Sequence, residues 1–537
     1  MKNKKETLLI LIILITICII IFNRDKLYEA KYIEPKDALL AITINGEIST
    51  TFPTTNAYTG TVECTTGTGK VEWNGTKWVL TTSGITKGST KCNVIFRTPN
   101  FAETILANNT LKTPLTTPGK EVSAYKESEI TATGSTDVSS TYQAYYFTYG
   151  TGWEANGTKF NLTGAAVTSD TYANSYSSLV GKYLPMKSSY FTIRDFSAST
   201  AGKMKTTTNL YAVYYVVSAT QESFTYKTIY SNKNTTEAEL ASTVDDYGTS
   251  YYFRGAVKNN YVEFANKCWR IVRVGGDGSV KLILHNDNTA KAANPCASAN
   301  NSTSAAFARY SGSAYISSFN SNYDDNAYVG FKYGTVGASG YDATHANTNK
   351  STILTNLETW YTNNLAAYES VIDDNVWCND KTNVADTTFN PWNWSNVNGL
   401  GYAKNVTYYG ATQRLVSTSD SAGGTGPSLK CTGELSKITS KVVLITADEL
   451  AFAGYAYNIG NRTTYLQENA TDTYWWSLSP IEFYNGNAFV WIVRGSNGRF
   501  SAGTRVGNKL GVRPSISLKS TTNVTGEGTS DKPYKVI

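Results

Sequence analysis

The chain has 537 residues, so several domains are expected rather than one. Charged residues make up only 17% and aromatic residues 13%, with 38 Tyr and 11 Trp, and this composition favours strands and turns over helices. The formal net charge is +6, and no dense block of Lys and Arg follows residue 5, which argues against a nucleic-acid partner.

The chain begins with a basic tip and an apolar segment. Residues 2–5 read Lys-Asn-Lys-Lys, and residues 7–22 contain no charged side chain. This pattern is typical of a signal peptide or a signal anchor. No small-x-small cleavage site follows closely, so residues 1–22 are expected to be a cytoplasmic tip and an uncleaved anchor. The prediction is a single-pass membrane protein with an extracellular C-terminal part, or a secreted protein if residues 7–22 are cleaved.

Six of the seven cysteines lie outside the apolar segment, since only Cys18 falls within it. An even number of cysteines fits a compartment that permits disulfides. Nearest-neighbour pairing is favoured because each pair then falls within one expected domain. The expected disulfides are Cys64–Cys92, Cys268–Cys296 and Cys378–Cys431. No CxxC motif is present, so neither a zinc ribbon nor a redox motif is indicated.

After a polar spacer at residues 23–36, residues 37–98 are expected to form a small β module. Residues 71–81 place Asn-Gly between aromatic and β-branched residues, which predicts a hairpin whose two turn positions have positive φ. Residues 153–163 share the Trp, the Asn-Gly-Thr-Lys, an aromatic residue and the Leu-Thr of that stretch. Duplication and coincidence explain this likeness equally well.

The next residues are expected to link the first β module to two further domains. Residues 99–121 contain three prolines and are interpreted as a linker, with a short helix near Ala102–Ala107. Residues 122–218 contain strand-like aromatic runs and are interpreted as a second β module. Residues 219–250 then connect it to a third domain at 251–537.

The third domain has strands at both ends and a long insert between them. Its first hairpin is expected around the Gly-Gly-Asp-Gly turn at residues 275–278. The insert at residues 286–440 is rich in Ser, Asn, Tyr and Gly, and helical spacing predicts one helix around Ile353–Tyr361. Strands are expected again at Ala488–Val493 and Gly511–Leu518.

Several stretches of this domain resemble a known family. They are YYFRGAVKNNYVEFANKCWRIVRVGGDGSVKLIL at 251–284, ITADELAFAG at 445–454, YWWSLSP at 474–480, GVRPSISLK at 511–519 and the closing GEGTSDKPYKVI. Together they are similar to surface proteins of gut Firmicutes to which no activity is assigned. The Cys64/Cys92 module resembles modules found upstream in the same proteins.

The WWS-x-SP and GVRP motifs are also similar to those of the C-type-lectin-like fold, in the branch shared with formylglycine-generating enzymes. This resemblance implies that the termini of the domain meet in a small sheet and that the insert forms the surface facing a ligand. The enzymes of that branch use cysteines late in the domain, and none follows Cys431 here, so their chemistry is not expected. The expected fold class is mainly β with some α, comprising the membrane segment, two small β-sandwich-like modules and a C-terminal α+β C-type-lectin-like domain.

Candidate ligand-binding residues are aromatic and basic. Four aromatic residues lie in the insert between Cys378 and Cys431, where a binding surface and ordinary loop packing are equally favoured. Of two adjacent tryptophans, strand alternation places one in the core and leaves the other to stack on a sugar or peptide. Two arginines offer donors to an anionic ligand, although structural pairing with Asp or Glu is favoured for them. The candidates are Trp392, Trp394, Tyr408, Tyr409, Trp475, Trp476, Arg494 and Arg513.

Two polar motifs have simpler explanations than a site. The carboxylates of Asp448 and Glu449 suggest acid–base chemistry, but a capping box from Thr446 to Glu449, with Gly454 ending the helix, is favoured. An oxygen-rich run offers Ca²⁺ ligands without matching an EF-hand, and a solvated turn is favoured for it. Its residues are Asn320, Asn322, Asp324, Asp325 and Asn326. Calcium is therefore a weak alternative to having no cofactor.

Catalytic motifs are missing from the sequence. Its two histidines, His285 and His345, lie far apart, and there is no HExxH, no GxSxG and no phosphate-binding glycine loop. The leading hypothesis is a non-enzymatic cell-surface protein that binds or adheres to an extracellular glycan or protein. A structural surface-layer or assembly component is the alternative. An extracellular glycan hydrolase, which needs two carboxylates facing each other across a groove, comes third.

Overall fold

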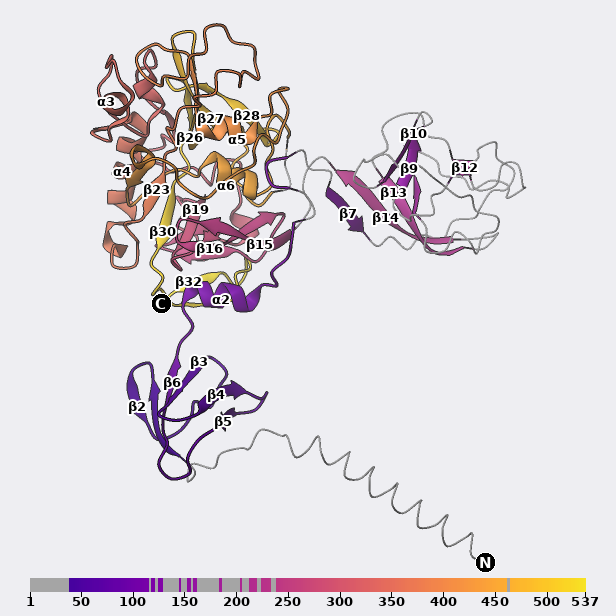
Figure 1. The fold of residues 1–537 in the computed structure, drawn as a ribbon, viewed down its shortest axis with the longest axis vertical. Coiled ribbons are helices and arrows are strands. Elements are labelled where there is room, and N and C mark those ends of the chain that lie inside the picture. The colour runs from indigo at the N-terminus through magenta and orange to yellow at the C-terminus, as the bar shows by residue number, and fades with distance from the viewer. Residues whose placement is uncertain are drawn as a thin grey trace, which may run out of the picture. The chain divides into compact units, whose positions relative to one another are not determined.

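The computed structural model describes residues 38–114, 117–120, 238–460 and 464–537, together with the backbone of strands β7 to β14 between residues 124 and 232. The predicted anchor and spacer lie outside these residues. Within the described part of the chain, no helix combines the length and hydropathy needed to cross a bilayer. The chain divides into two compact units, Met1–Thr104 and Ile105–Ile537 (Figure 1).

The smaller unit contains a four-stranded sheet in the order β2-β1-β6-β3. Strand β6 buries every second side chain, as a strand with one face on a core must. The core behind it consists of Val71, Trp78, Leu80, Val94 and Phe96. The strands are β1 (Leu39–Ile44), β2 (Glu47–Ser49), β3 (Thr59–Cys64), β4 (Thr68–Trp73), β5 (Trp78–Ser83) and β6 (Lys91–Arg97).

The predicted hairpin is confirmed, since β4 and β5 pair from Thr68↔Ser83 to Trp73↔Trp78. Its predicted turn geometry was wrong. The loop spans residues 74–77, and of the Asn-Gly pair only Gly75 has a positive φ, of 99°. The side chain of Asn74 instead accepts hydrogen bonds from the backbone N–H groups of Thr76 and Lys77, which closes a longer loop.

The predicted helix after the first module is α2 (Phe101–Asn108). It begins where Asn100 and Glu103 exchange side-chain and backbone hydrogen bonds of 2.9 Å. Residues 105–114 and 117–120, predicted as part of a linker, include backbone hydrogen bonds and bridges to the rest of the larger unit. For example, the N–H of Lys112 donates to the carbonyl of Leu240 at 2.9 Å.

Strands β7 to β14 include the second hairpin expected from the repeated Asn-Gly stretch, since β9 pairs with β10. Four others form a sheet in the order β11-β13-β14-β7. Strand β14 falls in the residues predicted as a connector. The strands are β7 (Ala124–Ser128), β8 (Ala144–Tyr145), β9 (Gly152–Ala155), β10 (Thr158–Asn161), β11 (Tyr183–Pro185), β12 (Lys203–Met204), β13 (Ala212–Ala219) and β14 (Phe224–Asn232).

The larger unit has an eight-stranded mixed sheet. The predicted hairpin at residues 275–278 is confirmed, because β18 and β19 pair on either side of this turn. The last strand, β32, lies parallel to β17, so the C-terminus joins the sheet that contains β15 and β16. The strands are β15 (Ala238–Asp245), β16 (Gly248–Gly255), β17 (Tyr261–Phe264), β18 (Lys267–Val274), β19 (Val280–Asn286), β30 (Ser515–Leu518), β31 (Val524–Thr525) and β32 (Tyr534–Val536).

A second, six-stranded sheet is built on β26, and the short helices α5 and α6 lie between the two sheets (Figure 1). Every residue of β26 except the last is buried, because both of its faces are covered. This sheet contains β20 (Ile316–Ser318), β24 (Thr407–Tyr408), β26 (Trp475–Tyr484), β27 (Asn487–Arg494), β28 (Arg499–Arg505) and β29 (Lys509–Gly511). Two-stranded ribbons are formed by β21 (Lys332–Tyr333) with β22 (Asn349–Lys350) and by β23 (Val376–Cys378) with β25 (Lys437–Thr439).

Several local predictions for the larger unit are confirmed. The helix expected in the insert is α4 (Thr352–Asn364), which follows α3 (Tyr341–His345). The capping box of Thr446 and Glu449 begins α6 (Ala447–Phe452), and α5 spans Gly410–Leu415. All three expected disulfides are present. The described chain is therefore mainly β, with few helices and several mixed sheets.

Candidate functional site

A charged recess opens in the larger unit where the β15–β16 turn, the β18–β19 turn, β23 and the first turn of α6 meet. It encloses about 50 Å³, room for a few waters or one head group rather than a whole small molecule. Six carboxylates and four basic side chains line it, a formal excess of two negative charges. We call this feature the recess and describe it from its floor outward.

A chain of ion pairs forms the floor. The ammonium of Lys281, on β19, lies 2.6 Å from one oxygen of Glu449 and 2.7 Å from the other. The Nε of Arg273 also donates to Glu449, at 3.0 Å, and its Nη1 donates to Asp245 at 3.0 Å. Lys281 additionally lies 4.3 Å from the ring centre of Trp377, a cation–π contact. The floor thus joins β18 and β19 to the first turn of α6.

A second group of ion pairs forms the wall around Arg414 of α5. Its guanidinium binds both carboxylate oxygens of Asp448 at 2.7 Å and donates through Nη1 to Asp380 at 2.7 Å. Burial alone would lower the pKa of Arg414, but these two carboxylates outweigh it and raise the pKa. One cation therefore holds two acidic residues in fixed positions.

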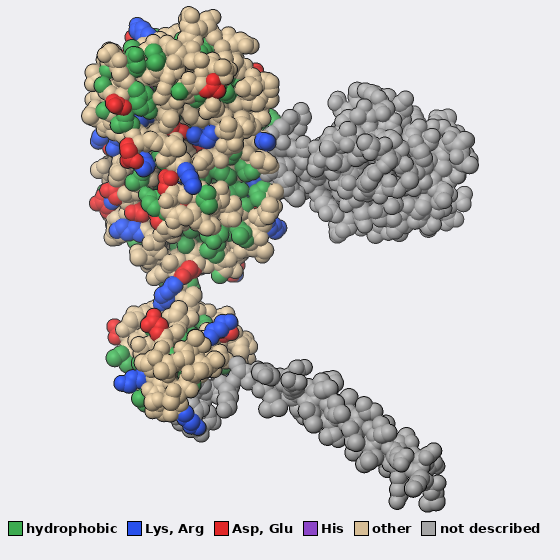
Figure 2. All heavy atoms as spheres, in the orientation of Figure 1, with side chains coloured by type: hydrophobic (Ala, Val, Ile, Leu, Met, Phe, Trp, Pro, Cys, Tyr) green, Lys and Arg blue, Asp and Glu red, His purple; other side chains and the backbone are tan. Residues whose placement is uncertain are grey.

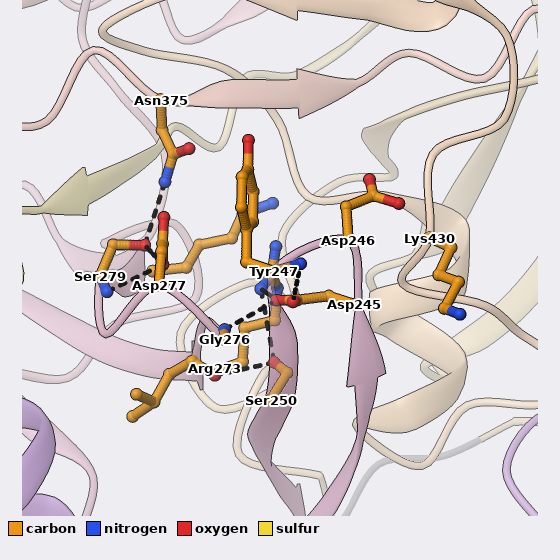
Figure 3. Close-up of polar contacts among 12 residues, drawn as sticks. Asp245, Asp246, Tyr247, Ser250, Arg273, Gly276, Asp277, Ser279, Asn375 and Lys430 are labelled. Carbon is orange, nitrogen blue, oxygen red and sulfur yellow. Dashed lines mark hydrogen bonds and ion pairs between the residues drawn. The ribbon is translucent and has the colours of Figure 1, made fainter.

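The mouth of the recess differs from the floor and the wall because its charged side chains are exposed and lack ionic partners. Tyr247 is 55% exposed and projects between Asp277 and Asp246, with Lys430 beyond Asp246 (Figure 3). In the described part of the chain, no ion pair involves Asp246, Asp277 or Lys430. Asp246 accepts the backbone N–H of Cys431 at 3.0 Å, and Asp277 accepts the N–H of Ser279 at 3.0 Å.

These contacts determine what the recess can do chemically. Burial would raise the pKa of Glu449, but Lys281 and Arg273 outweigh it and lower the pKa to about 2. A carboxylate so strongly neutralised holds no proton to donate near neutral pH. Glu449 therefore supplies a fixed charge rather than a general acid, and the carboxylates without ionic partners are at the mouth.

Three of the predicted aromatic residues are brought together by the structure. The ring of Trp392 lies 6.2 Å from that of Trp394 and 5.4 Å from that of Tyr408. The first two are half-buried and Tyr408 is buried, in a cluster with Phe389. Beneath them, the indole N–H of Trp394 donates to Glu482 at 2.6 Å. Burial raises the pKa of this carboxyl group to about 8.

The other predicted residues lie elsewhere. Four of them are fully buried: Tyr409, Trp475, Trp476 and Arg513. The prediction that one of the two adjacent tryptophans faces solvent was therefore wrong. Arg513 donates through Nε to the carbonyl of Leu284 at 2.9 Å and lies 5.0 Å from the ring centre of Trp475.

Arg494 is half-buried against Tyr474, with 5.5 Å between its guanidinium and the ring centre. The expected pairing of Arg494 and Arg513 with Asp or Glu was wrong, since among the described residues neither forms an ion pair. Both instead lie against aromatic rings.

The oxygen-rich run forms an internal turn. Asn320, Asp325 and Asn326 are buried, so the solvated turn expected here was wrong for these three. The two oxygens of Asp325 accept the backbone N–H groups of Ala327 and Gly337. Among the described residues, no three His, Cys, Asp or Glu side chains cluster in a way that could hold a metal.

Of the charged residues that line the recess, the sequence drew attention to Asp448 and Glu449 as a carboxylate pair, and it favoured a helix cap for them. One available signal was the Gly-Gly-Asp-Gly turn, because a Cβ on Gly276 would lie only 2.6 Å from Asp245 Oδ1. Its backbone N–H donates to Asp245 at 3.0 Å, so this glycine permits the two turns to approach each other. The remaining residues come from segments far apart in the chain.

No family model, curated protein or solved structure matches the chain.

Proposed function

We propose that this protein is a non-enzymatic cell-surface binding or adhesion protein that recognises an extracellular protein or glycan. In this proposal residues 7–22 anchor it in the membrane and the β modules form a stalk. Residues 238–537, from β15 onward, form the binding domain, with a C-type-lectin-like fold. The three disulfides support an extracellular location, and the strand β32 beside β17 supports a fold whose termini share a sheet.

The observation that carries the proposal is the mouth of the recess. An exposed tyrosine ring stands between two exposed carboxylates that lack ionic partners, above a recess with excess negative charge. An aromatic face beside carboxylates suits an ammonium or guanidinium group, through cation–π attraction and charge-assisted hydrogen bonds. The small volume suits a head group that protrudes from a larger partner.

The chemistry of the floor favours binding over hydrolysis. A glycan hydrolase needs a carboxyl group that keeps its proton near neutral pH and faces its substrate. Glu449 has the opposite property, and Asp448 and Asp380 are both paired with Arg414. On the visible face of the larger unit, acidic and basic side chains are scattered rather than gathered in one large patch, so recognition is expected to be local (Figure 2).

The test is a peptide array probed with the protein lacking only residues 1–22. Each peptide carries lysine, arginine, glutamine or glutamate at one central position. We expect retention by lysine and arginine peptides, and at least a tenfold loss for a Tyr247→Ala/Asp246→Asn variant. Tyr474→Ala is the matched control, because Tyr474 is 37% exposed and lies outside the recess. Equal retention of all four peptide classes would contradict the proposal.

A further inference from the structure

The larger unit has a second cavity that shares no residue with the recess. It lies between the end of β19 and Arg309 and has a volume of about 290 Å³. This is near the lower end of the ~300–1,000 Å³ typical of small-molecule sites. A ligand the size of a single sugar ring therefore fits here, whereas the recess is too small to enclose one.

Small side chains make room for the cavity. Four alanines contribute to its lining: Ala290, Ala292, Ala299 and Ala305. Apart from Arg309, no lining side chain is larger than asparagine. The space is thus open because the sequence places methyl groups where longer side chains would fill it.

The loop around the cavity is held rigidly by amide side chains. Asn286 donates to the carbonyls of Pro295 and Asn300 at 3.1 and 3.0 Å. Asn288 donates to the carbonyl of Ala292 and accepts its N–H, at 3.1 and 2.8 Å. The Cys268–Cys296 disulfide ties the same loop to β18. A cavity held in this way loses little conformational entropy when a ligand binds.

The two charged residues of the lining are occupied within the protein. One oxygen of Asp287 lies 2.8 Å from the ammonium of Lys267, and the other accepts the backbone N–H of Arg309 at 2.9 Å. The guanidinium of Arg309 donates to the carbonyls of Ser304 and Phe307 and lies 4.5 Å from the ring centre of Tyr315. The charge of Asp287 is therefore neutralised inside the protein, whereas the guanidinium of Arg309 is engaged only by neutral carbonyl groups and an aromatic ring.

Neutral polar atoms remain free in the lining. Among the described residues, Asn300 Oδ1 and the hydroxyl groups of Thr289 and Ser302 have no hydrogen-bond partner. An amide oxygen accepts from a hydroxyl, and a hydroxyl both donates and accepts. These atoms match the hydroxyl groups of a polyol such as a sugar ring.

We propose that this cavity binds an uncharged sugar ring, as a second site in addition to the recess. The proposal rests on the proposed binding function but uses different residues and a different ligand chemistry. No aromatic ring lines the cavity, so binding depends on a few hydrogen bonds. A dissociation constant of about 1 mM for a monosaccharide is expected on that basis.

The test is saturation-transfer NMR on the protein lacking only residues 1–22. The probes are neutral hexoses, N-acetylhexosamines, glucuronate and a sialic acid. We expect transfer to at least one neutral sugar, and stronger transfer to it than to the two anionic ones, because the guanidinium of Arg309 is already engaged by carbonyl groups of the protein. Absence of transfer to every neutral sugar, or equal transfer to the anionic ones, overturns the proposal.

Variants locate the site. Ala299→Trp and, independently, Ser302→Trp fill the cavity from exposed positions, and each is expected to weaken binding at least tenfold. Ala293→Trp is the matched control, because Ala293 is exposed in the same loop and does not line the cavity. Sugar binding retained in both filled variants overturns the assignment. Tyr247→Ala is expected to keep sugar binding, because Tyr247 does not line this cavity. The proposal for the recess and the proposal for this cavity can therefore be contradicted independently.

Discussion

The ammonium of Lys281 and the carboxylate of Glu449 lie 2.6 Å apart, with both side chains almost completely buried. The same carboxylate accepts the N–H and the hydroxyl of Thr446 and so caps α6. A motif interpreted from the sequence as a helix cap is therefore also the centre of the recess floor. One residue fixes both the start of α6 and its distance from β19.

Glu449→Gln is expected to destabilise the larger unit strongly. The amide can still cap α6, but it leaves the buried Lys281 without a carboxylate, and removing one partner of a buried pair costs about 3–5 kcal/mol. The measurement is the free energy of unfolding in urea. Glu358→Gln is the control, because its ion pair with Lys350 is exposed and is expected to contribute at most about 1 kcal/mol.

Acidification is expected to reduce the difference in unfolding free energy between the wild type and Glu449→Gln. The pKa of Glu449 is about 2 in the folded protein and near the ordinary 4.5 when unfolded. Its stabilising effect is therefore complete above pH 4.5 and is lost as the pH falls toward 2. A difference between wild type and Glu449→Gln that stays constant from pH 7 to pH 3 would contradict the assignment.

Glu482 is expected to give the wild type the opposite pH dependence, which the substitution Glu482→Gln should remove. Burial raises the pKa of Glu482 to about 8, and Trp394 is its one hydrogen-bond partner among the described residues. The folded protein therefore keeps a proton that the unfolded chain loses near pH 4.5. Wild-type stability falls as the pH rises between these values, by up to about 1.4 kcal/mol per pH unit.

The glutamine retains an acceptor for Trp394 and does not titrate, so this decline should be absent from the variant. Stability is followed by thermal denaturation at pH 5, 7 and 9. Glu527→Gln serves as the control, because Glu527 is 62% exposed in its pair with Lys532. If the Glu482→Gln variant declines as steeply as the wild type, the buried carboxyl group is not the cause.

The sequence predicts best what depends on neighbouring residues. The hairpin at 71–81, the capping box and the helix α4 follow from turn chemistry, side-chain capping and periodicity within about a dozen residues. The disulfides followed from proximity along the chain. For the hairpin, the capping box and α4 the determining contacts are local, so the pattern is visible without the fold.

The recess could not be predicted because its contacts are distant in the sequence. Arg273 and Glu449 are separated by 176 residues, and Lys281 and Glu449 by 168. The prediction that one of the two tryptophans of β26 faces solvent was wrong for a related reason. Alternation exposes one face only when a sheet has a solvent side, whereas β26 is covered on both.

Arg513→Met is expected to lower stability without affecting ligand binding. The side chain is fully buried, and burial lowers its pKa to about 10. Methionine removes its hydrogen bonds to the carbonyls of Leu284 and Leu466, at a cost of roughly 2–4 kcal/mol. The measurement is the melting temperature, and a variant whose melting temperature equals that of the wild type would contradict this structural role.

The two disulfides of the larger unit offer a paired test of both proposed sites. Removing Cys378–Cys431, whose cysteines are 53 residues apart, should cost about 4 kcal/mol by the chain-entropy model, and removing Cys268–Cys296 slightly less. The first pair lines the recess, where the N–H of Cys431 positions Asp246. The second ties the loop around the second cavity, proposed to bind a sugar, to β18.

The Cys378→Ala/Cys431→Ala variant should therefore lose binding to basic peptides and keep binding to neutral sugars. The Cys268→Ala/Cys296→Ala variant should show the reverse. Both are measured below the temperature at which either unfolds, by the array and NMR experiments above. Because the two variants are destabilised by similar amounts, a shared loss of both activities would indicate general unfolding, whereas opposite losses require two separate sites, each held by its own disulfide.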